Sequence, residues 1–300
     1  MSTADAETSP AGLERTCWQG MEIGHPADWE PGFLSGPDVP GRCVFVDRRF
    51  QRLEVHWRDL PRRPDLKQMY TRLAKSRRKK GVSALTDVGR WEGFVCREEA
   101  GSVVYAGCYF PDPRRLVEAV LIWPGRRDRK VERAVLGAIR PQGPSKALRW
   151  QALGLSASLP RDFRLTEAKS LVGRVTWDFR RPGRRGVGLS MERIVMGRAW
   201  LKAPLSDWVR GQLPQGFRPV RELAAEAGPH RGVELRSRRS NVLRWVLGLA
   251  VSRVDVAWSC PQQDRVYRVG LWQRTSGDVD WPEPLEVRCC RTVRIGPGVG

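Results

Sequence analysis

Cysteine and histidine are the residues of this chain with the widest chemistry, because a thiolate can act as a nucleophile or a metal ligand and an imidazole can move protons. The chain has seven cysteines and three histidines, which are Cys17, Cys43, Cys96, Cys108, Cys260, Cys289, Cys290, His25, His56 and His230. No two cysteines have C-x-x-C spacing, and the histidines lie far apart in sequence, without the spacing of metal ligands. The sequence therefore predicts no metal site and no disulfide scaffold, and it favours a reducing cytoplasm.

Catalysis by a thiol requires a base or a positive field beside the sulfur. Cys108 and Cys260 are candidates, with His56 as a base, but the sequence does not place these side chains together. Free cysteine is among the most buried residue types, which favours inert thiols. Glu98 and Glu99 are expected at a solvated hairpin tip. Because no nucleophile-elbow, phosphate-loop, dinucleotide-binding or H-E-x-x-H motif occurs, we expect no enzymatic activity and no cofactor.

A strongly basic surface is the second chemical feature. The chain has 53 Lys and Arg against 33 Asp and Glu, a formal net charge of +20, and such a field attracts polyanions. Three clusters hold the candidate polyanion-binding residues, which are Arg72, Lys75, Arg77, Arg78, Lys79 and Lys80; Arg180, Arg181, Arg184 and Arg185; and Arg236, Arg238 and Arg239. Each cluster alone is typical of a solvated face, whereas together they could bind phosphates. Without a sequence-reading motif, binding to nucleic acid would be sequence-independent.

The third cluster begins an insertion over residues 237–251, which the first copy lacks. Its apolar residues alternate like one face of a strand, although a short helix is an alternative, and they are Leu243, Trp245, Leu247 and Leu249. One interpretation is a packed lid over a sheet. The other is an apolar surface, flanked by arginine, that binds a protein partner. The sequence leaves both open.

Two tandem copies of one unit are expected to position these residues. The motif Pro26-Ala-Asp28-Trp29 recurs as Pro160-Arg-Asp162-Phe163. Three further matches keep the same order, and they join 53–57 to 187–191, 91–97 to 230–236, and 115–121 to 265–271. Four matches in order indicate an internal duplication. No histidine is kept in both copies, which removes histidine as a shared catalyst.

The patterning predicts an α+β fold of two similar units, each a largely antiparallel sheet covered by helices. Apolar residues at helical spacing predict helices, which are 66–79, 130–139, 205–213 and a shorter one over 285–292. Proline, glycine and polar residues set the expected boundaries, which are a disordered N-terminus over 1–15, a first unit over 16–140, a linker over 141–147, a second unit over 148–293 and a flexible tail over 294–300.

Each half of the chain resembles the Mog1/PsbP/DcrB-like sandwich. The likeness rests on the expected order β-turn-β-β-α-β-β-β-α and on the early Pro-x-Asp-aromatic motif, which begins at Pro26 and at Pro160. The resemblance implies a non-catalytic binding or assembly module, and it assigns no site residue.

Two functions compete at the level of sequence. The first is a cytoplasmic, non-catalytic protein-binding or assembly module with an unidentified protein partner. The alternative is sequence-independent binding of nucleic acid or another polyanion. A membrane span is not expected, because the longest apolar stretch, Val242 to Val251, is roughly half as long as the about 20 residues that a spanning helix needs.

Overall fold

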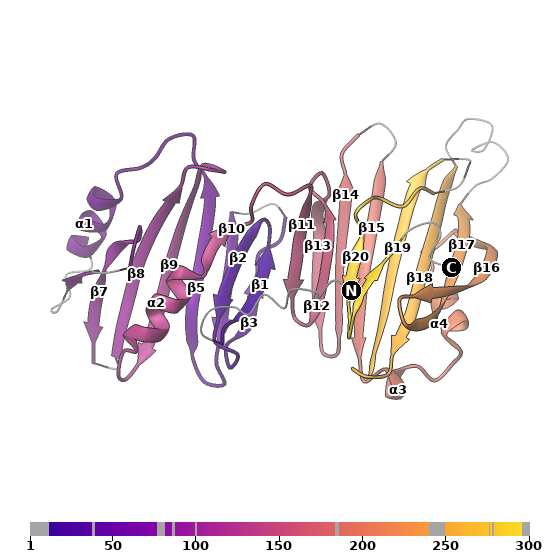
Figure 1. Cartoon of the computed structure of the whole chain (residues 1–300), viewed down its shortest axis with the longest axis horizontal. Helices are drawn as coiled ribbons and strands as arrows, with labels where there is room; N and C mark the ends of the chain where they lie inside the picture. The colour runs from indigo at the N-terminus through magenta and orange to yellow at the C-terminus, as the bar shows by residue number, and fades with distance from the viewer. Residues whose placement is uncertain are drawn as a thin grey trace, which may run out of the picture. The chain divides into compact units, whose positions relative to one another are not determined.

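The computed structural model describes residues 12–37, 40–76, 82–85, 88–99, 101–183, 186–239, 250–275, 277 and 279–295. Strands hold 56% of these residues and helices 12%. The chain divides into two compact units (Figure 1). The first unit comprises Met1–Pro144 and Gln151–Leu153, and the second comprises Ser145–Trp150 and Gly154–Gly300.

The first unit is built on a seven-stranded antiparallel sheet in the order β3-β4-β5-β9-β8-β7-β6, while β10, β2 and β1 pair separately. Its strands are β1 (Glu14–Trp18), β2 (Met21–His25), β3 (Glu30–Leu34), β4 (Gly41–Val46), β5 (Gln51–Asp59), β6 (Ser83–Ala84), β7 (Glu92–Glu98), β8 (Gly101–Phe110), β9 (Arg115–Pro124) and β10 (Ile139–Pro141). Its helices are α1 (Leu66–Ser76) and α2 (Arg129–Gly137).

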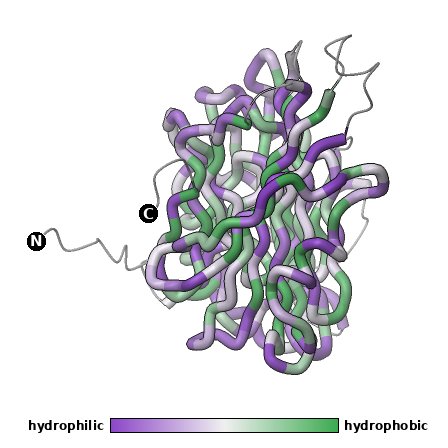
Figure 2. Tube along the Cα trace, turned by 90° about the vertical axis from the view of Figure 1, so that its right-hand side faces the viewer, coloured by the Kyte–Doolittle hydropathy of each residue, from purple (hydrophilic) through white to green (hydrophobic). Residues whose placement is uncertain are grey.

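Helix α1 packs against β7 through one apolar face. Leu66 and Tyr70 are buried against Phe94 and Tyr105, which lie on β7 and β8. Gly107 on β8 makes room for this helix, because a Cβ at that position would collide with the Tyr70 hydroxyl. Hydrophilic and hydrophobic residues are interspersed along the trace (Figure 2). Along β5, Leu53, Val55 and Trp57 are buried at alternate positions, as a half-buried strand requires.

The second unit is built on a second seven-stranded antiparallel sheet, in the order β13-β14-β15-β19-β18-β17-β16, and β20 pairs with both β12 and β21. The strands from residue 147 onward are β11 (Ala147–Ala152), β12 (Leu155–Pro160), β13 (Arg164–Leu171), β14 (Arg174–Arg181), β15 (Val187–Val195), β16 (Arg218–Ala227), β17 (His230–Arg239), β18 (Val251–Cys260), β19 (Arg265–Arg274), β20 (Glu286–Arg288) and β21 (Thr292–Arg294). The helices are α3 (Gly197–Trp200) and α4 (Leu205–Gly211).

The second sheet is buried on both faces along β18. On one face Val209 of α4 packs against Leu235 and Ala257. The rings of Trp258 and Tyr267 stack with centroids 5.4 Å apart and are almost fully buried. Trp258 therefore serves as a core anchor, as expected of a buried tryptophan.

The two large sheets have the same strand order. Strands β3, β4, β5, β6, β7, β8 and β9 occupy the same places as β13, β14, β15, β16, β17, β18 and β19, and a helical segment follows the third strand in each. The main difference is at one edge. The first unit ends in the two-residue β6, whereas the second ends in the ten-residue β16.

The expected α+β sandwich covered by helices is wrong, because the chain is mostly β. Helices α1, α2 and α4 lie where apolar spacing placed them, but they have only 11, 9 and 7 residues. The helix expected over 285–292 is absent, and β20 lies there. Short helices cover too little of a seven-stranded sheet to form a helical layer, and the fold therefore does not support the Mog1/PsbP/DcrB-like resemblance.

Several sequence-based expectations concern residues outside the described ranges. The expected N-terminal and C-terminal segments lie largely there, although Glu14 belongs to β1 and Arg294 to β21. Within the described ranges, no helix combines the length and the apolar character that crossing a membrane requires.

Candidate anion-binding groove in the second unit

Two pairs of arginines face each other across the edge hairpin of the second unit. Strand β16 is the last strand of its sheet, and β17 runs antiparallel beside it. In this ladder Arg218 is the direct partner of Arg238, and Arg221 is the direct partner of Arg236. Like charges directly opposite each other destabilise a strand pair. The hairpin therefore gathers four guanidinium groups at one end, and their positive charge attracts anionic groups.

The hairpin, strand β18 and the loop after β19 enclose a cavity of about 170 Å³, which we call the arginine groove. A small-molecule pocket typically measures about 300–1,000 Å³, so this cavity suits one side chain or one anionic group. The residues that line it include four arginines and no carboxylate, and they are Val220, Arg221, Arg236, Ser237, Arg238, Ser252, Arg253, Val254, Gly277, Val279 and Trp281.

Ser237 adds a hydroxyl to this lining. The residue is only 3% exposed, and its Oγ has no hydrogen-bond partner within the described part of the chain. A buried polar group left without a partner costs about 1–3 kcal/mol. Ser237 and Arg253 are direct partners on β17 and β18 and share one face of the sheet, whereas Arg236 and Arg238 point to the other face, so this hydroxyl does not lie beside those two arginines.

Carboxylates outside the groove orient two of its arginines. Arg236 Nε lies 2.6 Å from Glu234 Oε1. Arg253 donates two hydrogen bonds to Asp255, at 2.6 and 2.8 Å, and Asp255 is fully buried. Gly270 on β19 leaves space for the second pair, because a Cβ there would collide with both partners. These ion pairs fix where the two cations lie.

The ion pairs continue from Arg253 beneath α4. Arg268 Nη2 lies 3.0 Å from Glu192 Oε2, and its Nη1 lies 3.9 Å from Asp255 Oδ1. Arg174 Nε lies 2.5 Å from Glu192 Oε1. Burial lowers the pKa of Arg268, and the two carboxylates raise it. With three arginines and two carboxylates, the network has a formal charge of 3 − 2 = +1.

The predicted basic clusters separate in the fold. Arg236 and Arg238 line the arginine groove, and Arg239 ends β17 outside its lining. On β14, Arg181 forms an ion pair with Asp162 at 2.7 Å and lies over the Phe163 ring. Of the predicted polyanion-binding residues, only Arg236 and Arg238 thus line the arginine groove.

Arg180 and the α1 residues have separate surroundings. Arg180 lies over the Trp272 ring, 5.7 Å from its centroid, and its direct strand partner is Arg164 on the opposite edge strand β13. Arg72 and Lys75 are exposed on α1 in the first unit. The remaining candidates lie outside the described residues, and they are Arg77, Arg78, Lys79, Lys80, Arg184, Arg185, Leu243, Trp245, Leu247 and Leu249.

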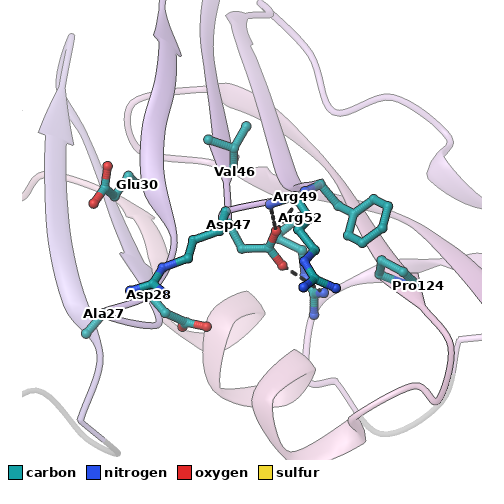
Figure 3. Close-up of a pocket in the computed structure, with 10 residues that line it drawn as sticks. Ala27, Asp28, Glu30, Val46, Asp47, Arg49, Arg52 and Pro124 are labelled. Atoms are coloured by element: carbon teal, nitrogen blue, oxygen red, sulfur yellow. Dashed lines mark hydrogen bonds and ion pairs between the residues drawn. The ribbon is translucent and has the colours of Figure 1, made fainter.

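The first unit has a wider pocket of about 660 Å³ at its Pro-x-Asp-aromatic motif (Figure 3). Asp28, Glu30 and Asp47 line it together with arginines, so its charge is mixed. Asp47 accepts hydrogen bonds from the backbone of Arg49 and the next residue, both at 2.7 Å, and these bonds lower its pKa. This carboxylate closes a turn, and the pocket has no excess of cations comparable to that of the arginine groove.

Packing explains why the Pro-x-Asp-aromatic motif carries an aromatic residue in both units. Arg52 lies 5.2 Å from the ring centroids of both Trp29 and Trp123. In the second unit Arg181 lies 4.8 Å from the ring of Phe163. In both units an arginine of the following hairpin thus covers the aromatic residue of the motif through a cation–π contact.

The candidate nucleophile Cys108 is buried in the first unit. Burial raises its pKa to about 11, so the thiol is protonated at neutral pH. The proposed base, His56, has its Nε2 2.7 Å from Glu54 Oε1. Neither observation provides the activated thiolate that nucleophilic catalysis needs.

Sequence reasoning missed Arg218, Arg221 and Arg253. Arg218 and Arg221 stand apart from the basic runs, and only the strand register places them opposite Arg238 and Arg236. The spacing Arg253-Val-Asp255 in an apolar strand was the one available signal, because residues two apart share a face.

Comparisons with known proteins leave the family of this chain open. No family model matches the sequence, and no curated protein matches it. Two solved structures of the T6SS immunity protein TplEi from Pseudomonas aeruginosa, one complexed with "L" peptide and one in the apo form, are similar at 12% identity and a TM-score of 0.37. The matches cover 91% and 90% of both chains, respectively. A TM-score this low identifies neither a family nor a function.

Proposed function

We propose that this chain is a non-catalytic protein-binding module. It binds a short, extended, acidic segment of a partner protein along the first four residues of strand β16, 218–221. The observation that carries the proposal is the strand register, which makes Arg218 the direct partner of Arg238 and Arg221 the direct partner of Arg236. The partner itself is unknown.

Edge protection alone does not explain these arginines. Natural sheets place charges, prolines and bulges on edge strands to prevent uncontrolled pairing, and Arg218, Pro219 and the bulge before Arg221 fit that purpose. However, protection needs charge only on the edge strand. A glutamate on β17 opposite each arginine would give the same protection and stabilise the hairpin, yet Arg236 and Arg238 stand there.

An extended segment matches the accessible part of the hairpin. Strand β16 ends its sheet, and Val220 is 67% exposed. Added strands bind such edges by main-chain hydrogen bonds, and alternate side chains give specificity. Farther along β16, Glu222 pairs with Arg210 at 2.6 Å, so the positive charge is confined to the beginning of the strand.

Acidic side chains fit the arginine groove in charge and in size. Arginine binds a carboxylate through two parallel hydrogen bonds. The cavity of about 170 Å³ holds an anionic side chain, and its half-buried apolar residues Val279 and Trp281 can contact the stem of that side chain. This mixed lining favours a protein ligand over a bare phosphate chain.

A labelled peptide of alternating glutamate and valine tests the proposal by fluorescence anisotropy. We expect saturable binding to the full chain, and at least about tenfold weaker binding to the double variant Arg218→Glu, Arg221→Glu, because one hydrogen bond to a charged group contributes about 1.5–3 kcal/mol. The control is Arg72→Glu, Lys75→Glu on α1, which changes the net charge equally. Equal losses in both variants would show that only net charge matters and would contradict the site.

Sequence-independent binding of nucleic acid is the second candidate, and the net charge of +20 favours it. Labelled single-stranded DNA in the same assay distinguishes the two. A polyanion binder holds DNA at least as tightly as the peptide, and its affinity falls steeply with salt. The protein-binding proposal expects the peptide to bind more tightly than DNA at physiological salt.

A further inference from the structure

Four potential metal ligands converge in the second unit, at the end of the β16–β17 hairpin that is remote from Arg236 and Arg238. His230 is the first residue of β17, Cys260 is the last residue of β18, and Cys289 and Cys290 follow β20. Their nitrogen and sulfur ligand atoms all lie within 4.8 Å of one another. Among the described residues, no other group of three or more such side chains meets in this way.

The spacing of these atoms is close to that of a tetrahedral zinc site. Zn–S bonds of about 2.3 Å and Zn–N bonds of about 2.0 Å place two sulfurs about 3.8 Å apart and sulfur and nitrogen about 3.5 Å apart. Here Cys289 Sγ lies 4.0 Å from Cys290 Sγ, and both sulfurs lie 3.2 Å from His230 Nε2. All of these cysteines are free thiols.

We propose that His230, Cys260, Cys289 and Cys290 form a structural zinc site that ties the β20–β21 hairpin to the ends of β17 and β18. Three sulfurs and one imidazole nitrogen are a donor set that selects zinc over hard cations such as magnesium or calcium. On binding, the thiols lose their protons to solvent, and all four donors come from protein, which is typical of a structural rather than a catalytic site.

The surroundings suit closed coordination. His230, Cys260 and Cys289 are 8%, 0% and 7% exposed, so little water competes for the metal. A site of this kind stabilises the fold directly, because the unfolded chain does not hold the four donors together.

In the first unit, apolar residues stand at the positions that correspond to His230 and Cys260. The repeat aligns His230 with Trp91, and the equivalent turns after β8 and β18 align Cys260 with Phe110. Trp91 and Phe110 are buried, and Arg90 lies 4.1 Å from the ring centroid of Phe110. Two large apolar side chains thus take the place of two ligands, which leaves the metal site specific to the second unit.

Metal analysis of the full chain tests the proposal. The protein is purified with reductant, stripped with a chelator and titrated with zinc in competition with a chromophoric chelator. We expect one zinc ion per chain. Cobalt should give the intense visible absorption bands of a tetrahedral thiolate complex. This cobalt spectrum is measured on the unmodified chain, so it does not depend on whether a variant folds.

Variants assign the ligands. Cys260→Ser and the double variant Cys289→Ser, Cys290→Ser should lose stoichiometric binding, whereas Cys17→Ala and Cys108→Ala in the first unit should keep it. The proposal is overturned if the reduced chain takes up no zinc, if the ligand variants bind as well as the controls, or if thiol titration finds a disulfide among these three cysteines.

Discussion

Arg221 on β16 and Arg236 on β17 are direct partners in an antiparallel ladder, although both are cations. Arg236 has a carboxylate, Glu234, 2.6 Å away on its own strand, but that carboxylate does not remove the positive charge of Arg221. Arg221 is therefore expected to favour binding of an acidic segment and to lower the stability of the free protein, and both effects can be measured.

Replacing Arg221 with glutamate should stabilise the free protein. The variant Arg221→Glu converts a like-charge cross-strand pair into an opposite-charge pair, a change of about 0.5–1 kcal/mol in the free energy of unfolding. Urea denaturation at low salt measures it. Arg72→Glu on α1, which lacks a cross-strand partner, should change stability by no more than about 0.5 kcal/mol. A destabilised Arg221→Glu would mean that an internal anion already neutralises the pair.

Adding one methyl group at Gly270 should disrupt the buried ion pair behind the arginine groove. A Cβ there collides with the Arg253 guanidinium and the Asp255 carboxylate, and breaking a buried pair costs about 3–5 kcal/mol. We expect Gly270→Ala to lose a large part of that amount in thermal or urea unfolding. Gly211→Ala in α4, where a Cβ meets nothing within 4 Å, is the matched control. Equal stability of both variants would contradict the described packing.

Acidification should weaken the first unit through His25. Its Nε2 lies 3.0 Å from Thr16 Oγ1, and burial lowers its pKa from 6.5 while the charge of Glu14 raises it in part. Because the folded pKa lies below the unfolded one, this contribution is complete above pH 6.5 and is lost as the pH falls below that value. Unfolding measured between about pH 5 and 7 should show a shallower slope for His25→Gln, by at most about 1.4 kcal/mol per pH unit. An unchanged slope would exclude His25 as the source.

Removing the guanidinium of Arg52 should loosen the first unit at its repeated motif. Arg52 contacts the rings of Trp29 and Trp123 and forms an ion pair with Asp47 at 3.3 Å. Each cation–π contact contributes about 0.5–1 kcal/mol, so Arg52→Ala should destabilise by about 1–2 kcal/mol. The exposed neighbour Arg49, replaced by alanine, is the control for charge. Equal effects of the two substitutions would remove the cation–π explanation.

The periodic parts of the fold could be predicted from the sequence. Apolar spacing placed α1 at Leu66, and alternation placed the central strands. The helix expected over 285–292 failed, because Leu285, Val287 and Cys289 are buried at alternate positions, which is the period of a strand. The mostly-β fold was missed because short helices have strong local signals, whereas long hairpins depend on pairing between distant residues.

The sites depend on register, and register is not visible in linear spacing. Arg236 and Arg238 were recognisable as a basic run, but their partners on β16 were not. His230 and Cys260 lie at the start of one strand and at the end of the next, where an antiparallel pair brings them together. Such long-range convergence is the physical reason why no ligand spacing appeared in the sequence.

Hydrogen exchange of the β16 backbone amides, with and without the glutamate–valine peptide, tests the central claim most directly. Strand addition at the edge predicts that the amides of residues 220–222 that point away from β17 become protected when the peptide binds, while those of β13, the opposite edge strand, do not change. Binding of the peptide with unchanged exchange along β16, or with protection at β13 instead, would contradict the proposed docking site.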